Sequence, residues 1–467
     1  LLELAPDAVN KADDIGVHPR GRGGYPLHLA LQNADCPVSV VKLLLKKNPS
    51  AVKYPWVNAC GLPLCCYLER ARKHAAWGHE EDEGGWAEEF PSLPSGELDF
   101  EIVKMLVDAY PEALGDIWGF TALSILCEGY DVSLELAQLL TGKDRARFQH
   151  DDESIRNSPI WVLLQNSLVT PFPTDVFRYL LECNPSSLKM ETRDLDDDDS
   201  YDELFQLFSE TPLHIACSNP TISAETVGLI IKHYPAMVKL EFKVDGFLPL
   251  HRLCKNKELE EQSSIQILKL LVNAYPGALK KRVSGSDRIT GNKERKLPTR
   301  LAEENMSFGF CKALLSERAR LSSIPGASIL QIACVCKCQL EMIKKLVEDD
   351  RELLLMKDDG GHVAIHTAAK YSSLEIIQYL VDSNESTLTM LDEFGELSLH
   401  KACRVGNVKA VEYLMEKNMA SVTTKNHHNL LPLHIMCDKA GKSEKLLQSV
   451  QYHESIFKLL QANPESL

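Results

Sequence analysis

The sequence predicts an all-α protein in which short helical hairpins follow one another in a row. A Pro-Leu-His motif returns along the chain, and its clearest copies end at His28, His214, His251 and His434. Looser copies lie around positions 366 and 400, which puts the last three histidines about 34 residues apart. A fixed period of this kind indicates that each copy is one supersecondary unit that stacks on its neighbours.

One complete unit spans residues 392–422. The turn comes first, and Gly395 is available there for a positive φ angle. A short helix is expected from Leu399 to Val405, and a second from Val408 to Lys417, with apolar residues at 408, 411, 414 and 415 on one face. Neither helix is long enough to be stable alone, so both must bury their apolar faces against each other and against adjoining units.

Residues at the helix boundaries support the same division. In the copy at Thr211-Pro212, threonine can cap the first helix and proline can occupy its first turn. Other copies carry Leu248 or Leu431 at the threonine position and forgo that cap. The second helix of many units meets a proline, such as Pro276, which cannot continue the helix.

This pattern resembles the ankyrin repeat, whose signature is a turn followed by Thr-Pro-Leu-His-x-Ala and two antiparallel helices. The resemblance covers nearly the whole chain and implies an ankyrin-repeat solenoid of about eleven helix-turn-helix units with short β-turn fingers. The motif histidine positions are then His28, Cys65, Ser124, Trp161, His214, His251, Arg300, Gln331, His366, His400 and His434. The Pro-x-x-Leu endings are similar to those of the long ankyrin arrays of diatoms and related algae.

We expect one continuous array over residues 1–467, interrupted by charged loops. N-terminal repeats occupy residues 1–190 with an insertion near 70–97, and an acidic insertion covers 191–210. C-terminal repeats occupy residues 211–467 with a basic insertion near 280–296. These insertions lack the apolar content to pack, so we expect mobile loops. The chain begins without methionine, in a stretch that matches the end of a repeat, so we expect a fragment of a longer protein.

The composition excludes several classes of function. A net charge of -15 argues against a nucleic-acid surface, which would need a basic stripe. No apolar run approaches the roughly twenty residues that span a bilayer, so we expect no membrane insertion. No signal peptide is visible, so we expect a cytoplasmic protein, with the nucleus as an alternative. We also expect the protein to be a monomer. We expect no enzyme, because no phosphate-cradling glycine motif, nucleophile elbow or kinase signature is present.

The histidines and cysteines do not predict a metal or cofactor site. Histidines of successive units lie about 10 Å apart, whereas zinc needs ligands at about 2.0–2.1 Å. We expect each ring to bond the backbone near the turn and to tie successive units together. Cys334, Cys336 and Cys338 lack the usual Cys-x-x-Cys spacing, but a metal- or redox-responsive element there is an alternative. Cysteines three residues after the motif histidine, from Cys127 to Cys437, should be buried apolar fillers.

The resemblance also implies where partners bind. In ankyrin repeats they dock on the concave side, against the turn tips and the exposed face of the first helix. By position, the outward residues are Trp118, Phe120, Phe247, Lys255, Asn256, His362, Lys370, Tyr371, Glu393, Phe394, Arg404, His427, His428 and Asp438. Aromatic residues and arginine supply most interface hot spots, although Trp118 or Phe247 could instead pack against the adjacent turn.

We therefore expect an elongated, non-catalytic scaffold that binds protein partners through the concave face of the solenoid. The alternative is the recognition arm of a larger enzyme, ubiquitin-ligase adaptor or channel whose other domains lie outside this fragment.

Overall fold

The computed structural model describes residues 26–33, 36–55, 62–72, 98–114, 121–129, 132–142, 158–188, 210–242, 245–284, 295–441 and 448–464. Within these ranges the regular structure is helical apart from two short strands, which confirms the all-α class. The chain divides into two compact units, which are described separately. The first holds residues 1–244 and 258–263, and the second holds residues 245–257 and 264–467.

The first unit is built from short helices and 3₁₀ turns. In chain order these are α1 (Pro26–Gln32), α2 (Val38–Lys47), η2 (Pro49–Lys53), α3 (Pro63–Arg72), α4 (Phe100–Ala109), η4 (Pro111–Leu114), α5 (Ala122–Glu128), α6 (Leu134–Thr141), α7 (Pro159–Gln165), α8 (Thr174–Cys183), η7 (Pro185–Leu188), α10 (Pro212–Ser218), α11 (Ala224–His233) and η8 (Pro235–Lys239).

These helices pack in two rows. The first helix of each repeat contacts the next, in the order α1, α3, α5, α7 and α10, and the second helices follow as α2, α4, α6, α8 and α11. Asparagine side chains tie the ends of the first helices together. The amide of Asn166 donates to the carbonyls of Cys127 and Gly129 at 2.9 and 2.8 Å, and Asn219 donates likewise to Leu164 at 2.8 Å. The first-helix ends are thereby held in register from one repeat to the next.

The second unit continues the same pattern. Its elements are α12 (Pro249–Leu253), α13 (Glu261–Ala274), η9 (Pro276–Lys280), β1 (Val283–Ser284), β2 (Arg295–Lys296), α14 (Pro298–Asn305), α15 (Phe308–Arg320), α16 (Ile329–Cys336), α17 (Leu340–Asp349), η10 (Arg351–Leu354), α18 (Ala364–Tyr371), α19 (Leu374–Ser383), η11 (Glu385–Thr389), α20 (Ser398–Val405), α21 (Val408–Lys417), η12 (Met419–Thr423), α22 (Pro432–Gly441) and α24 (Val450–Ala462). The two strands pair antiparallel.

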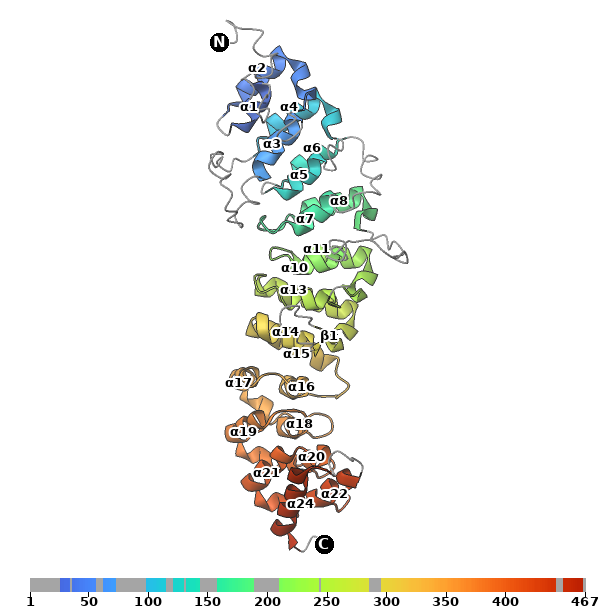
Figure 1. The fold of residues 1–467 in the computed structure, drawn as a ribbon, viewed down its shortest axis with the longest axis vertical. Coiled ribbons are helices and arrows are strands. Elements are labelled where there is room, and N and C mark those ends of the chain that lie inside the picture. Colours follow the sequence, from blue (N-terminus) through green and yellow to red (C-terminus); the bar gives the residue numbers. More distant parts are fainter. Residues whose placement is uncertain are drawn as a thin grey trace. The chain divides into compact units, whose positions relative to one another are not determined.

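Two rows of helices are clearest in the C-terminal half of this unit (Figure 1). We call α16, α18, α20 and α22 the first-helix row, and α17, α19, α21 and α24 the second-helix row. Successive helices of each row contact one another, and each first helix also contacts its own second helix. The core lies between the rows, where Cys403 and Val411 are completely buried.

The boundary residues act largely as the sequence predicts. The side chain of Thr211 accepts the His214 N–H and caps α10, and Gly406 ends α20 in the left-handed conformation at a φ of 76°. The prolines after many second helices open a 3₁₀ turn, as at Pro276, rather than only stopping the helix. Val408 was expected on the buried face of α21 but lies half-buried at its first position.

Five of the cysteines after the motif histidine are fully buried, as predicted, but Cys437 is exposed. The reason is its neighbours. The helix that carries Cys403, α20, has a first helix on each side, α18 and α22. The helix that carries Cys437, α22, contacts only one of the described first helices, α20, together with the second helix α24. Among the residues that the structure describes, no further first helix covers the other side of α22, and His434 is exposed there too.

Candidate interaction surface

The three successive turns before α18, α20 and α22 are each fixed from within by one side chain. The Oδ1 atom of Asp392 accepts the N–H groups of Phe394 and Glu396 at 2.9 and 2.8 Å. Asp358 and Asn426 hold the neighbouring turns in the same way. Such turns are rigid before any partner arrives, because their backbone donors are already bonded.

A positive φ angle lets the turns approach closely. Gly361 and Gly395 have φ angles of 74° and 70°, and Asn429 takes the equivalent position with 58°. A Cβ atom on Gly395 would lie 2.7 Å from Cδ2 of His427 in the next turn. At Gly395, glycine therefore relieves the strain of the positive φ angle and leaves space for the next turn.

Backbone hydrogen bonds join successive turns. The N–H of Asp359 donates to the Pro325 carbonyl at 3.1 Å, that of Glu393 to Gly360 at 3.1 Å, and that of His427 to Phe394 at 2.9 Å. We call residues 358–362, 392–396 and 426–430 the turn row. These bonds make the row one continuous edge, so a side chain on one turn is fixed relative to the next.

The motif histidine His366 ties two successive units together, as predicted. In His366, Nδ1 accepts the Val363 N–H at 3.2 Å and Nε2 lies 3.1 Å from the Glu396 carbonyl of the next turn. Because Nδ1 is an acceptor, the ring must be the neutral tautomer with its proton on Nε2. Burial lowers the pKa of His366 to about 4, although Asp392 and the Glu396 carbonyl oppose this shift. Gln331 makes the equivalent pair of bonds in its own repeat, at 2.7 and 2.6 Å.

A buried cluster of charges lies beneath the turn row. The ammonium of Lys401 is 2.5 Å from Oδ2 of Asp392 and 2.8 Å from Oε2 of Glu396. Arg404 bonds the other carboxylate oxygen of Glu396, while 52% of its own side chain stays exposed. Burial alone would raise the pKa of both carboxyl groups, but Lys401 holds both below their ordinary values. Backbone N–H groups lower the pKa of Asp392 further, and Asn426 and Arg404 lower that of Glu396. Both carboxylates are therefore charged at neutral pH.

His362 links this cluster to the preceding turn. Its Nδ1 lies 3.0 Å from Oδ1 of Asp358, and its Nε2 lies 3.3 Å from Oδ2 of Asp392. The ring thus bridges the aspartates of two successive turns. The cluster is not among the features predicted from the sequence. Its signal is a pair of acidic residues four and eight positions before a motif histidine, with bases one and four positions after it.

The structure places most of the predicted outward residues at the surface. Phe394 is 52% exposed, and His362 and Tyr371 are half-buried. Trp118 and Phe120 lie outside the described residues. The remaining exposed positions are Lys255, Lys370, Glu393, Arg404, His427, His428 and Asp438.

Phe247 and Asn256 were expected to face outward, but both are buried. The Phe247 ring packs 5.5 Å from the His251 ring, and Arg252 and Lys255 cover it at 5.3 and 5.5 Å from its centroid. The side chains of the two cations cover the aromatic ring and shield it from solvent. Phe247 is therefore packed rather than outward, and these contacts are with its own repeat rather than with the adjacent turn.

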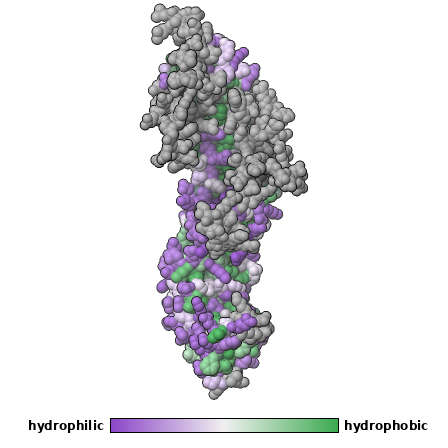
Figure 2. Space-filling view, in the orientation of Figure 1, coloured by the Kyte–Doolittle hydropathy of each residue, from purple (hydrophilic) through white to green (hydrophobic). Residues whose placement is uncertain are grey.

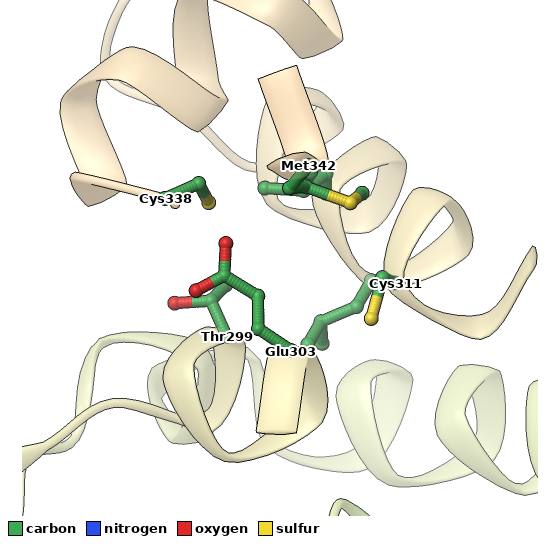
Figure 3. Close-up of a pocket in the computed structure, with 7 residues that line it drawn as sticks. Thr299, Glu303, Cys311, Cys338 and Met342 are labelled. Carbon is green, nitrogen blue, oxygen red and sulfur yellow. The ribbon is translucent and has the colours of Figure 1, made fainter. Parts of the chain in front are cut away.

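Cys338, which follows α16, and Cys311 of α15 line a small pocket (Figure 3). The carboxylate of Glu303 extends between Thr299 and Cys338, and Met342 and Cys311 line other sides. Oε1 of Glu303 accepts the Gln339 N–H at 2.9 Å, so the carboxylate is held at the start of α17. Burial raises the pKa of the Cys334 and Cys311 thiols to about 12, which keeps them protonated and unreactive at neutral pH.

The described surface offers few other signs of chemistry. Hydrophilic residues predominate on the face in view, with hydrophobic ones scattered among them (Figure 2). Within the described ranges, no three histidines, cysteines or acidic residues are grouped so that they could hold a metal ion. None of the helices described has the length and apolar character needed to cross a membrane.

Comparison with protein families gives one match. Residues 365–415 match the family model for ankyrin repeats (many copies). The segment runs from α18 to α21 and includes the turn at 392–396, so it confirms the ankyrin-repeat prediction for this part of the chain. A comparison with curated proteins finds no match.

Proposed function

We propose that this chain is a non-catalytic protein-interaction scaffold in which ankyrin units form one long array. The match at residues 365–415 supports this proposal, because helix pairs before and after it repeat the same arrangement. The bond from a helix-start N–H to a histidine Nδ1 recurs at His214, His251 and His434, far outside the matched segment. The closer likeness to algal arrays remains a prediction.

The exposure of the Phe394 ring on a hydrogen-bonded turn is the observation that best supports partner binding. Its ring is 52% exposed, yet its backbone N–H is held by Asp392 and its carbonyl accepts the His427 N–H. A large ring displayed on a rigid backbone loses little entropy on binding and gains the apolar area that interface hot spots use. Glu393 and Arg404 provide charge beside it, which can set the orientation of a partner.

The expected partner is therefore a protein that lies against the turn row and the first-helix row. A standard interface buries about 800 Å² on each side, so several successive repeats would have to contribute. The proposal includes no catalytic step and no cofactor, and treats the chain as a cytoplasmic monomer.

The test compares partner capture by the wild-type chain, Phe394→Ala and Phe457→Ala, with captured proteins identified by mass spectrometry. Phe457 is a matched control, since its ring is 59% exposed but lies on α24 of the second-helix row. We expect Phe394→Ala alone to lose partners, with a change in stability below about 0.5 kcal/mol. Unchanged capture by Phe394→Ala, or equal loss in both variants, would contradict the proposed surface.

A further inference from the structure

Three helices of the first-helix row lack acidic residues, whereas the fourth, α22, carries Asp438. The sequences of α16, α18 and α20 contain no aspartate or glutamate. Each has an exposed base at or just after its last turn, namely Lys337, Lys370 and Arg404. The second helices beside them mix both signs, with the acids Glu341, Glu348, Asp349, Glu375, Asp382, Glu412 and Glu416 and the bases Lys344, Lys345, Lys409 and Lys417. In a chain with a net charge of -15, these three first helices therefore stand out as locally basic.

Two of the three exposed bases lie against a neighbouring side chain, Lys370 against an aromatic ring and Arg404 against a buried acid. The Lys370 ammonium lies 4.8 Å from the centroid of the half-buried Tyr371 ring. One nitrogen of Arg404 bonds Glu396, whose side chain is only 2% exposed, so the buried carboxylate orients the guanidinium group. A partner can therefore contact the exposed cation but not the carboxylate that holds it.

From this arrangement we infer that the first-helix row binds an extended acidic segment of a partner protein. The inference rests on the proposed scaffold function and specifies its partner. Packed helices lie about 8–10 Å apart, which sets the spacing of the bases along the row. A polyproline II segment has three residues per turn and rises about 3.1 Å per residue, so every third side chain lies on one face about 9 Å apart.

The matching ligand therefore has an acidic residue at every third position. Prolines between the acids suit the surface, because aromatic side chains are the usual platform for polyproline II segments. Tyr371 and the exposed Phe394 provide such rings beside the bases. Nucleic acid fits less well, since Asp359 and Glu393 are exposed on the adjoining turns and a phosphate backbone places a charge at every nucleotide. The proposed segment carries acids only at every third position, so its uncharged residues can lie opposite these two acids.

The test measures binding of fluorescent peptides to the full chain by anisotropy. The probe is a twelve-residue repeat of Glu-Pro-Pro, designed on the geometry above. One control peptide alternates Glu and Pro, which places its acids on different faces, and a second replaces Glu with Lys. A single-stranded oligonucleotide is the fourth ligand. We expect the Glu-Pro-Pro peptide to bind most tightly, and its affinity to fall as salt rises.

Charge-reversal variants locate the site. Lys370→Glu should weaken binding about five- to tenfold, whereas Lys409→Glu should change it less than about twofold. Lys409 is the matched control, because it is an exposed lysine of α21 in the second-helix row. Equal weakening by both variants would show non-specific attraction and overturn the inference. The same holds if Lys370→Glu lowers only the melting temperature, which would mean that Lys370 merely stabilises the end of α18.

The remaining outcomes also decide the question. Tighter binding of the oligonucleotide, equal binding of the alternating peptide, or no binding of any peptide would each refute the extended acidic ligand. Partner capture separates this failure from that of the scaffold proposal. A wild-type chain that ignores the peptides but still captures partners through Phe394 refutes the acidic segment alone. Loss of the Phe394 dependence refutes the scaffold surface itself.

Discussion

Replacing His366 tests whether the motif histidine is a tie between repeats. His366→Ala removes both bonds of the ring, to the Val363 N–H and to the Glu396 carbonyl. His366→Gln is the matched control, because Gln331 makes the same pair of bonds at the same position of its own repeat. The two variants therefore separate loss of the tie from loss of the imidazole.

The expected size of the effect follows from these bonds. A typical hydrogen bond contributes about 1 kcal/mol, and a buried group left without a partner costs about 1–3 kcal/mol. His366→Ala should therefore lower the free energy of unfolding by about 2–4 kcal/mol at pH 7. His366→Gln should cost less than about 1 kcal/mol.

The pH dependence gives a second, independent readout. The pKa of His366 falls from 6.5 to about 4 on folding. Between pH 6.5 and pH 4, His366 is therefore protonated in the unfolded chain but neutral in the folded chain. Stability is thus lost as the pH falls from 6.5 towards 4, and at pH 5 this loss is about 2 kcal/mol. His366→Gln removes this loss, so the variant should be within about 1 kcal/mol of the wild type at pH 7 and more stable than it by about 1–2 kcal/mol at pH 5.

Urea unfolding followed by circular dichroism at pH 7 and pH 5 measures both effects. Hydrogen exchange at the Val363 amide reports the tie locally, which matters because repeat arrays can unfold in parts. If glutamine proves as damaging as alanine at pH 7, or leaves the pH dependence of the wild type unchanged, the role assigned to the ring is wrong.

The remaining predictions concern the buried charges and the thiols. Lys401→Met leaves the carboxylates of Asp392 and Glu396 without their shared ammonium, so it should cost about 3–5 kcal/mol at pH 7 in urea unfolding. Because the pKa of both carboxyls is lowered on folding, this cost should shrink as the pH falls and they become protonated; a cost independent of pH would count against a charged cluster. In the native chain, maleimide should label Cys437 at least about tenfold faster than the buried Cys403, as mapped by mass spectrometry, and comparable rates would show that the packing of α20 is misassigned.

Local features of the fold could be predicted from the sequence. The helices at 398–405 and 408–417 follow from periodicity, and the left-handed Gly395 and Gly406 follow from their lack of a side chain. The histidine tie could also be inferred, because identical units must repeat identical contacts. Each of these depends on the sequence within one unit or on its repetition.

Features set by neighbouring units were harder to predict. Cys437 matches Cys403 in sequence, but its exposure depends on which helix lies beyond α22. Phe247 occupies a turn position that looks outward, yet Arg252 and Lys255 fold over its ring. The charge cluster escaped prediction because its partners come from the turn, the first helix and the preceding turn together.

Hydrogen exchange of the full chain, with and without a captured partner, tests the interaction surface most directly. Binding should slow exchange in the turn row and in α18 and α20, while α19 and α21 keep their rates. Protection confined to α19 and α21, with the turn row unchanged, would show that partners use the opposite face and that the proposed binding surface is wrong.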